Sequence, residues 1–217
     1  ILPFTAYLLR TSKRNWQRIL FLFSIIIQTI AIAFTKSWGA VLGIGLLVVL
    51  IIISRKNFQR RIVIVFGLIF LVFAFIGIVG RLQKDKGFVA ESRERIFHKV
   101  FAAAMHKPIL GWGWANADYA FESVVWPIPM RFDVYVDKAH STILEVFATT
   151  GIIGLVFYSA ILFRILKLLI HNLKSKNKIN YLWHETILIA FILYLFHAQT
   201  NVISINEEIF FWIIMGI

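Results

Sequence analysis

The 217 residues contain no cysteine, and this absence limits the chemistry that the chain can perform. Without thiols there is no disulfide, no thiolate metal site and no cysteine nucleophile. The sequence also lacks a phosphate-binding P-loop, a G-x-G-x-x-G dinucleotide pattern and an H-E-x-x-H zinc pattern. Thiol chemistry, nucleotide binding and zinc-peptidase chemistry of the familiar kinds are therefore not expected.

Charged residues are also few, at 16% of the chain, and they are almost absent from its long apolar runs. Hydrophobic residues reach 59%, including 21 phenylalanines, with a mean hydropathy of +0.79. Soluble domains usually hold ~45–50% apolar residues. The composition therefore predicts a protein that lies in a lipid bilayer.

Five apolar runs are long enough to cross a bilayer, given ~1.5 Å of rise per residue and a ~30 Å hydrocarbon core. They are Ile19–Phe34, Trp38–Ile53, Ile62–Val79, Ser141–Ile170 and Thr186–Ile203, with partial spans at both ends. Lipid offers the backbone no hydrogen-bond partner, so each span must be helical. We expect an all-α polytopic protein in which 1–217 is one membrane domain. Because these residues begin at Ile1 without a Met, we expect them to be an internal piece of a longer chain.

The connections between spans alternate in charge along the chain. One set holds thirteen cations and a single acid, Glu185. Its cations are Arg10, Lys13, Arg14, Arg18, Arg55, Lys56, Arg60, Arg61, Arg164, Lys167, Lys174, Lys176 and Lys178. The other segments hold ten cations and ten acids. Cytoplasmic loops collect Lys and Arg, so the first set is predicted to face inward and to meet anionic headgroups. Cytoplasmic anchoring therefore explains the net charge of +12, which does not imply nucleic-acid binding.

The loop 80–139 is predicted to lie outside, and it is too long for a simple connection. Apolar residues recur with helical spacing over 92–107, with Ser92 as a candidate N-cap, and Pro108 ends the helix. We expect an interfacial amphipathic helix, followed by a glycine- and tryptophan-rich turn that returns to the headgroup region. The expected apolar face comprises Ile96, Phe97, Val100, Phe101, Ala104 and Met105.

This helix also carries cations suited to phosphate: Arg93, Arg95, Lys99 and Lys107. Arginine presents a planar fork of donors that matches phosphate oxygens. They could hold a phosphate-bearing substrate, or they could merely contact lipid phosphates, and composition is compatible with either role.

An ordered pattern of these residues resembles the O-antigen ligase and polymerase family. It comprises Arg93, Phe97, Pro108, Gly111, Trp112 and Gly113, then Ala139 and His140 ahead of "TILEVFATTGIIGL". The resemblance runs from Ser92 to Leu155, and it identifies the chain as the C-terminal part of such a protein. Weaker similarity occurs at "FTKSWGAVLG" and "FWIIMG".

The resemblance implies a GT-C-like helical membrane glycosyltransferase without a nucleotide-sugar pocket. Such enzymes transfer a glycan from undecaprenyl pyrophosphate to a glycan or lipid-A-core-type acceptor. They act at the outer face of the bacterial cytoplasmic (inner) membrane, and no cofactor or metal is expected. By resemblance, Arg93 engages the pyrophosphate and His140 activates the acceptor hydroxyl.

The sequence departs from the family pattern at two positions. Trp38 follows Ser37 where the family often has an arginine that binds phosphate, and Lys36 or Arg81 could replace that arginine. Ser141 follows His140 where Asn is usual. The first departure bears on catalytic competence more than the second.

Physical arguments that do not depend on the family resemblance also favour His140 as a general base. An unperturbed histidine has a pKa near ~6.5 and can accept a proton around neutral pH. The start of a helix carries exposed N–H groups and partial positive charge, which favour neutral imidazole over imidazolium. The alternative is a histidine that caps a helix, a role many polar residues could fill.

Three further residues are candidates for support. Arg95 could join Arg93, whereas Glu145 is predicted to be rotated away from His140 and to pair with an unseen helix. His197 lies near the outer end of a span, close to Gln199 and Asn201. Polar groups there are functional candidates, although hydrogen bonding between helices would also explain them.

The leading hypothesis is therefore a ligase or polymerase that uses a lipid pyrophosphate donor. A transporter of lipid-linked glycan would need charges deep within several spans, where this chain is almost wholly apolar. A catalytically inactive scaffold for envelope assembly is the other alternative, and Trp38 is the residue that favours it.

Overall fold

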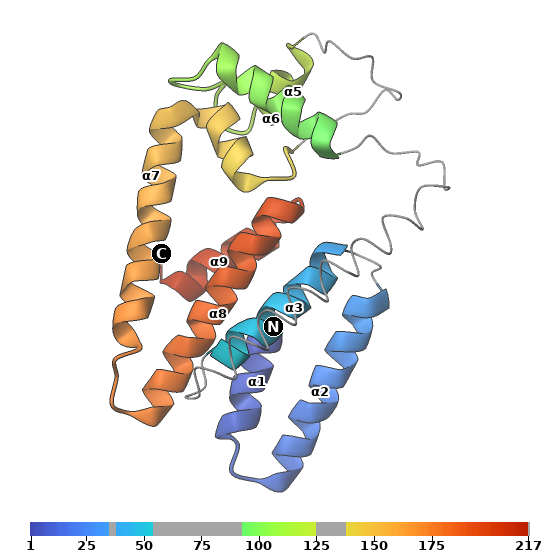
Figure 1. The fold of residues 1–217 in the computed structure, drawn as a ribbon, viewed down its shortest axis with the longest axis vertical. Helices are drawn as coiled ribbons and strands as arrows, with labels where there is room; N and C mark the ends of the chain where they lie inside the picture. The colour runs from blue at the N-terminus through green and yellow to red at the C-terminus, as the bar shows by residue number, and fades with distance from the viewer. Residues whose placement is uncertain (35–37, 54–92, 125–137, 217) are drawn as a thin grey trace. The chain divides into compact units, whose positions relative to one another are not determined.

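A computed structural model describes residues 1–34, 38–53, 93–124 and 138–216 (Figure 1). Within those ranges every regular element is a helix and none is a strand, which confirms the all-α prediction. The elements are α1 (Leu2–Thr11), α2 (Asn15–Phe34), α3 (Trp38–Ile53), α5 (Arg93–His106), α6 (Ala117–Glu122), α7 (Thr142–Asn172), α8 (Lys178–Thr200) and α9 (Ile205–Met215).

Three of these helices, α2, α7 and α8, are long and apolar enough to cross a membrane. This confirms that the chain is a helical membrane protein. Helix α3 has the bounds predicted for it from the sequence. The predicted span Ile62–Val79 lies outside the described residues.

The boundaries of α8 differ from the predicted span Thr186–Ile203. The helix begins earlier, at Lys178, because its polar first turns continue the helix ahead of the apolar run. It ends at Thr200, and Ile203 lies in the connection to α9, so the predicted end is wrong. A capping box at Ser204 and Glu207 starts a new helix there and stops the old one from continuing.

Helix α7 is broken within its length rather than continuous. Gly151 has φ 67° and ψ −167°, which no α-helical residue adopts, and Figure 1 shows the bend. The part after the break, 152–172, spans about 30 Å at ~1.5 Å per residue. That part alone is long enough to cross a bilayer. The residues before the break are therefore free to serve another purpose.

The described helices fall into two compact units. The first contains Ile1–Lys84 and Leu166–His197, and the second contains Asp85–Ile165 and Ala198–Ile217. In the first unit α1 and α2 form an antiparallel hairpin (Figure 1). Gln28 joins them by donating to Thr5 Oγ1 at 3.1 Å, and it also donates to Ser24 Oγ at 2.9 Å.

An ion pair and an aromatic contact attach α1 to the beginning of α8. Arg10 donates to the carboxylate of Glu185 at 3.3 Å, and Glu185 is only 6% exposed. The ring of Tyr7 lies 5.3 Å from that of Trp183 in an edge-on arrangement. Glu185 is the single acid of the predicted cytoplasmic set, which also contains thirteen cations. In the structure it pairs with Arg10 inside the first unit.

Removal of the Arg10 side chain tests this attachment. We expect Arg10→Ala to lower the free energy of unfolding by about 2 kcal/mol, because the buried Glu185 carboxylate then loses the cation it faces. Thermal unfolding of the detergent-solubilised protein measures the change. Arg14→Ala, at an exposed position in the turn that follows α1, is the control. Equal stability of the two variants would contradict the assignment.

Candidate functional site

The predicted external helix exists as α5, and it packs on protein. Ile96, Val100 and Ala104 are each no more than 4% exposed, and they form one cluster with Phe121 and Ala148. These contacts join α5 to α6 and to the first part of α7. The second unit therefore has its own small hydrophobic core.

The expectation of a helix that lies with its whole apolar face on the membrane needs correction. The side of α5 centred on Val100 faces protein and is unavailable to lipid. Phe101 and Met105 are each 53% exposed, so only this edge of the predicted apolar face lies open. The sequence showed the correct helical period but could not show that α6 and α7 cover most of the stripe.

Two cations of α5 and the following turn lie over aromatic rings. Lys99 Nζ is 4.0 Å from the centre of the Phe121 ring, and Lys107 Nζ is 3.9 Å from that of Trp112. Burial lowers the pKa of Lys99, while the nearby Glu122 carboxylate acts in the opposite direction. These contacts hold both ammonium groups against the protein surface.

The turn after α5 docks onto the break in α7 through the backbone. Trp112 N–H donates to Ala148 O at 2.9 Å, and Gly113 N–H donates to Thr149 O at 2.8 Å. In the opposite direction, Ile152 N–H donates to Pro108 O at 2.8 Å. The turn thus takes up hydrogen-bonding groups that the broken helix leaves open.

The approach of the two segments is close enough to require glycine on both sides. A Cβ on Gly111 would lie 2.5 Å from the backbone oxygen of Thr149, and one on Gly151 would lie 2.6 Å from Leu110 N. Both glycines also have positive φ, of 69° and 67°. Backbone atoms cannot move aside as a flexible side chain can, so any side chain here would separate the segments.

His140 lies immediately before α7 in an unusual backbone conformation. Its φ is 55°, in the left-handed region that residues with a Cβ rarely adopt. On one side, Ala139 N–H donates to the Glu145 carboxylate at 3.3 Å. The His140 side chain is half-buried. Strain of this kind persists only where neighbours hold the backbone in place.

Glu145 thus has a role that the sequence did not predict. Its position five residues after His140 suggested that it faces away, yet its carboxylate reaches back to the backbone just before the histidine. The prediction considered helical geometry alone, whereas Ala139 and His140 lie outside the helix. Glu145 is therefore a group that fixes the backbone around His140.

Ser141 fixes the other side of His140. Its hydroxyl accepts from Leu144 N–H at 3.4 Å, as an N-cap does, and donates to Gln199 Oε1 at 2.8 Å. Thr142 Oγ1 also donates, to Ala198 O, at 3.1 Å. Asn and Ser are comparable N-caps, so Ser141 can preserve the capping that the usual Asn would provide. Gln199, a polar residue singled out in the sequence, forms a bond between helices.

The other candidate residues differ in whether the structure describes them and in how buried they are. Arg93 is the first residue of α5, and its side chain lies outside what the structure describes. Arg95 follows it, half-buried, in the same turn of the same unit as His140. Lys36 and Arg81 lie outside the described residues, and His197 is half-buried near the end of α8.

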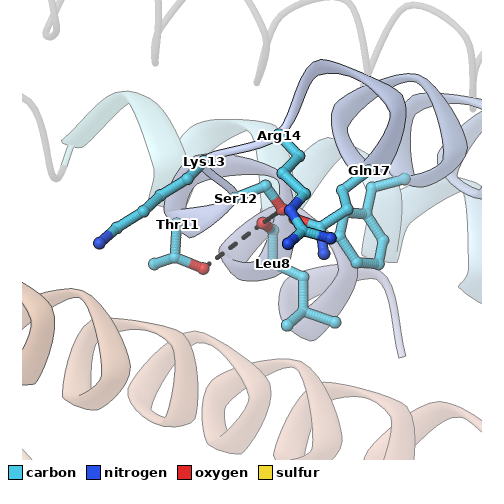
Figure 2. Close-up of a pocket in the computed structure, with 7 residues that line it drawn as sticks. Leu8, Thr11, Ser12, Lys13, Arg14 and Gln17 are labelled. Atoms are coloured by element: carbon cyan, nitrogen blue, oxygen red, sulfur yellow. Dashed lines mark hydrogen bonds between the residues drawn. The ribbon is translucent and has the colours of Figure 1, made fainter.

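A hollow of about 430 Å³ opens elsewhere, where α1 turns into α2. Figure 2 shows the residues that line it, with Arg14 beside Gln17 and Lys13 extending away from them. It contains none of the candidate residues, and its loop belongs to the set predicted to face the cytoplasm. We assign it no part in the site.

The described residues contain no group of three or more His, Asp or Glu side chains placed to hold a metal ion. The docking of the glycine-rich turn on Gly151 was missed from the sequence. An isolated glycine inside an apolar run was the available signal, because such a glycine often marks a close backbone approach.

These features define a helical membrane protein whose second unit contains the cation-bearing helix α5 and a histidine whose backbone is fixed by its neighbours. A family model described as O-antigen ligase matches residues 20–159. The chain belongs to the O-antigen ligase family, as the residue pattern from Ser92 to Leu155 predicted. No curated protein and no solved structure matches the chain.

Substitution of the two buried glycines tests the docked turn. We expect Gly151→Ala and Gly111→Ala each to destabilise the protein by about 3 kcal/mol or more, through a clash with backbone and a strained φ. Yield after detergent extraction and thermal unfolding report the loss. Gly43→Ala is the matched control, since nothing lies within 4 Å of its added Cβ. Stability of Gly151→Ala equal to that control would contradict the docking.

Proposed function

We propose that this protein transfers a glycan from undecaprenyl pyrophosphate to an acceptor hydroxyl at the outer face of the cytoplasmic membrane. Membership of the O-antigen ligase family supports an enzyme of the ligase or polymerase kind. The charge alternation along the chain supports an outward site, because loop 80–139 and His140 fall in the balanced set.

The observation that carries the proposal is the fixed backbone of His140. A strained left-handed residue between the Glu145 contact and the Ser141 cap indicates a side chain held in a definite direction. The same unit contains α5 with Arg93 and Arg95. A base and a set of cations in one compact unit match what the reaction requires.

The chemistry assigns each group a task. The acceptor oxygen attacks the anomeric carbon, its proton passes to His140, and the bond from that carbon to the pyrophosphate oxygen breaks. Undecaprenyl pyrophosphate leaves with its electron pair, and Arg93, supported by Arg95, offsets the growing negative charge. Lys36 or Arg81 supplies a second cation. Guanidinium groups suffice for this charge, so we propose a metal-independent reaction.

Alanine substitutions test the assignment. We expect His140→Ala and Arg93→Ala to reduce transfer by about 10²-fold or more, since each removes a group that acts in the transition state. The assay uses the full-length protein in membranes with a lipid-pyrophosphate glycan and candidate acceptors, in EDTA. His98→Ala, at an exposed position on α5, is the control. Normal transfer by both inserted variants would exclude the proposal.

Trp38 supports one other function, a scaffold without catalytic activity in an envelope-assembly complex. It occupies a position where the family often has a phosphate-binding arginine, at the start of α3. The sparse charge within the apolar runs disfavours the remaining alternative, a transporter.

Restoring the arginine distinguishes an impaired enzyme from a scaffold. We expect Trp38→Arg to raise the rate of transfer, because it returns a fixed donor fork to the pyrophosphate. Trp38→Leu, which returns no charge, is the control. A protein that shows no transfer either before or after the change to arginine would favour the scaffold.

A further inference from the structure

Trp112 makes two hydrogen bonds that end on two different helices. Its indole Nε1–H donates to Ala103 O of α5 at 2.7 Å, and its backbone N–H donates to Ala148 O of α7 at 2.9 Å. Its ring lies under Lys107 Nζ and meets Tyr119 edge-on, with ring centres 5.8 Å apart. One residue thus connects the end of α5 to the first part of α7, before its break.

Neither carbonyl accepts the hydrogen bond that a regular α-helix would give it, from the N–H four residues later. Lys107 N–H, the regular partner of Ala103 O, donates instead to Ala104 O at 3.2 Å. Ile152 N–H, the regular partner of Ala148 O, donates to Pro108 O. Ala103 and Ala148 are both 0% exposed, so their carbonyls would otherwise lack partners away from water.

The two helices hold the two groups that the proposed reaction needs, the arginines for the pyrophosphate and the histidine base. Helix α5 begins with Arg93 and Arg95, and α7 is preceded by His140. We propose that Trp112 is a positioning residue, which fixes α5 against α7 and so sets the separation of the pyrophosphate-binding arginines from the base. This rests on the function proposed above and assigns Trp112 no contact with substrate.

The alternative for Trp112 is an interfacial anchor, as expected for tryptophan near headgroups. Trp114 offers the comparison, because it lies in the same turn and is 76% exposed. An anchor role predicts similar effects at both positions, whereas a positioning role predicts an effect at Trp112 alone. Phe preserves an aromatic ring at either position and removes only the indole N–H and some area.

The kinetic test compares Trp112→Phe with Trp114→Phe in the full-length protein in membranes. We expect Trp112→Phe to lower kcat about 100-fold with the KM for the lipid donor unchanged, because the arginines still bind but the base is misplaced. Trp114→Phe should match the parent. A Trp112→Phe protein that loses only yield or thermal stability, with parental kcat per folded molecule, would overturn the proposal.

A structural test decides the matter without any activity. The 217 residues contain no cysteine, so spin labels can be placed at Met105→Cys and Ile143→Cys after replacing any cysteine elsewhere in the full-length gene. We expect a narrow distance distribution in the parent and in Trp114→Phe, and a broadened or shifted one in Trp112→Phe. An unchanged distribution would overturn the positioning role even if transfer is never observed.

A milder replacement covers the case in which Trp112→Phe does not fold. Benzothienylalanine at position 112 replaces the indole N–H by sulfur and retains the size and shape of the ring. We expect it to broaden the spin-label distribution in the same direction. A parental distribution with this residue would show that the bond to Ala103 O does not position the helices, whereas failure of His140→Ala to affect transfer would count against the proposed function alone.

Discussion

The exchange of backbone hydrogen bonds between the turn 108–113 and the break at Gly151 is the constraint on which the second unit depends. A helix that opens in apolar surroundings exposes carbonyl and amide groups whose desolvation is costly. Here the turn supplies N–H groups to Ala148 O and Thr149 O and accepts from Ile152 N–H. Because a Cβ on Gly111 or on Gly151 would clash with the backbone of the other segment, this approach depends on glycine at both positions.

The break also explains how a residue at a predicted span end can lie in a unit that packs on protein. Since 152–172 is long enough to cross alone, the residues before Gly151 can pack on α5 and α6 instead of lipid. His140 is then held by contacts on both sides, from Glu145 and from Ser141. Its strained backbone is sustained by this local network rather than by the membrane.

The sequence was informative wherever one physical factor dominated. Long apolar runs predicted α2, α3, α7 and α8, and helical periodicity over 92–107 predicted α5, which is observed at Arg93–His106. The ordered motif predicted the family whose model matches residues 20–159. In these cases hydrophobic pattern and length decide the outcome, and distant contacts change only the ends of the helices.

Other features depended on contacts that a single sequence does not reveal. The left-handed conformation of His140, the return of Glu145 to Ala139 N–H and the hydrogen bond from Trp112 to Ala103 O all involve residues apart in the chain or outside regular helix geometry. Helical spacing suggested that Glu145 faces away from His140. That prediction assumed that both residues lie in one helix, whereas His140 precedes α7. The placement of Lys36 and Arg81 remains a prediction.

The docked turn has a consequence for biogenesis. Residues 108–113 precede α7 in the chain, so on synthesis they emerge first, but their hydrogen-bonding partners do not exist until residues 148–152 follow. An opened helix in lipid is unfavourable without those partners, so the bent form of α7 becomes favourable only once the turn has docked. Docking of the turn is thus a condition for the bent form of α7, and a chain in which residues 108–113 do not reach residues 148–152 would favour a continuous helix.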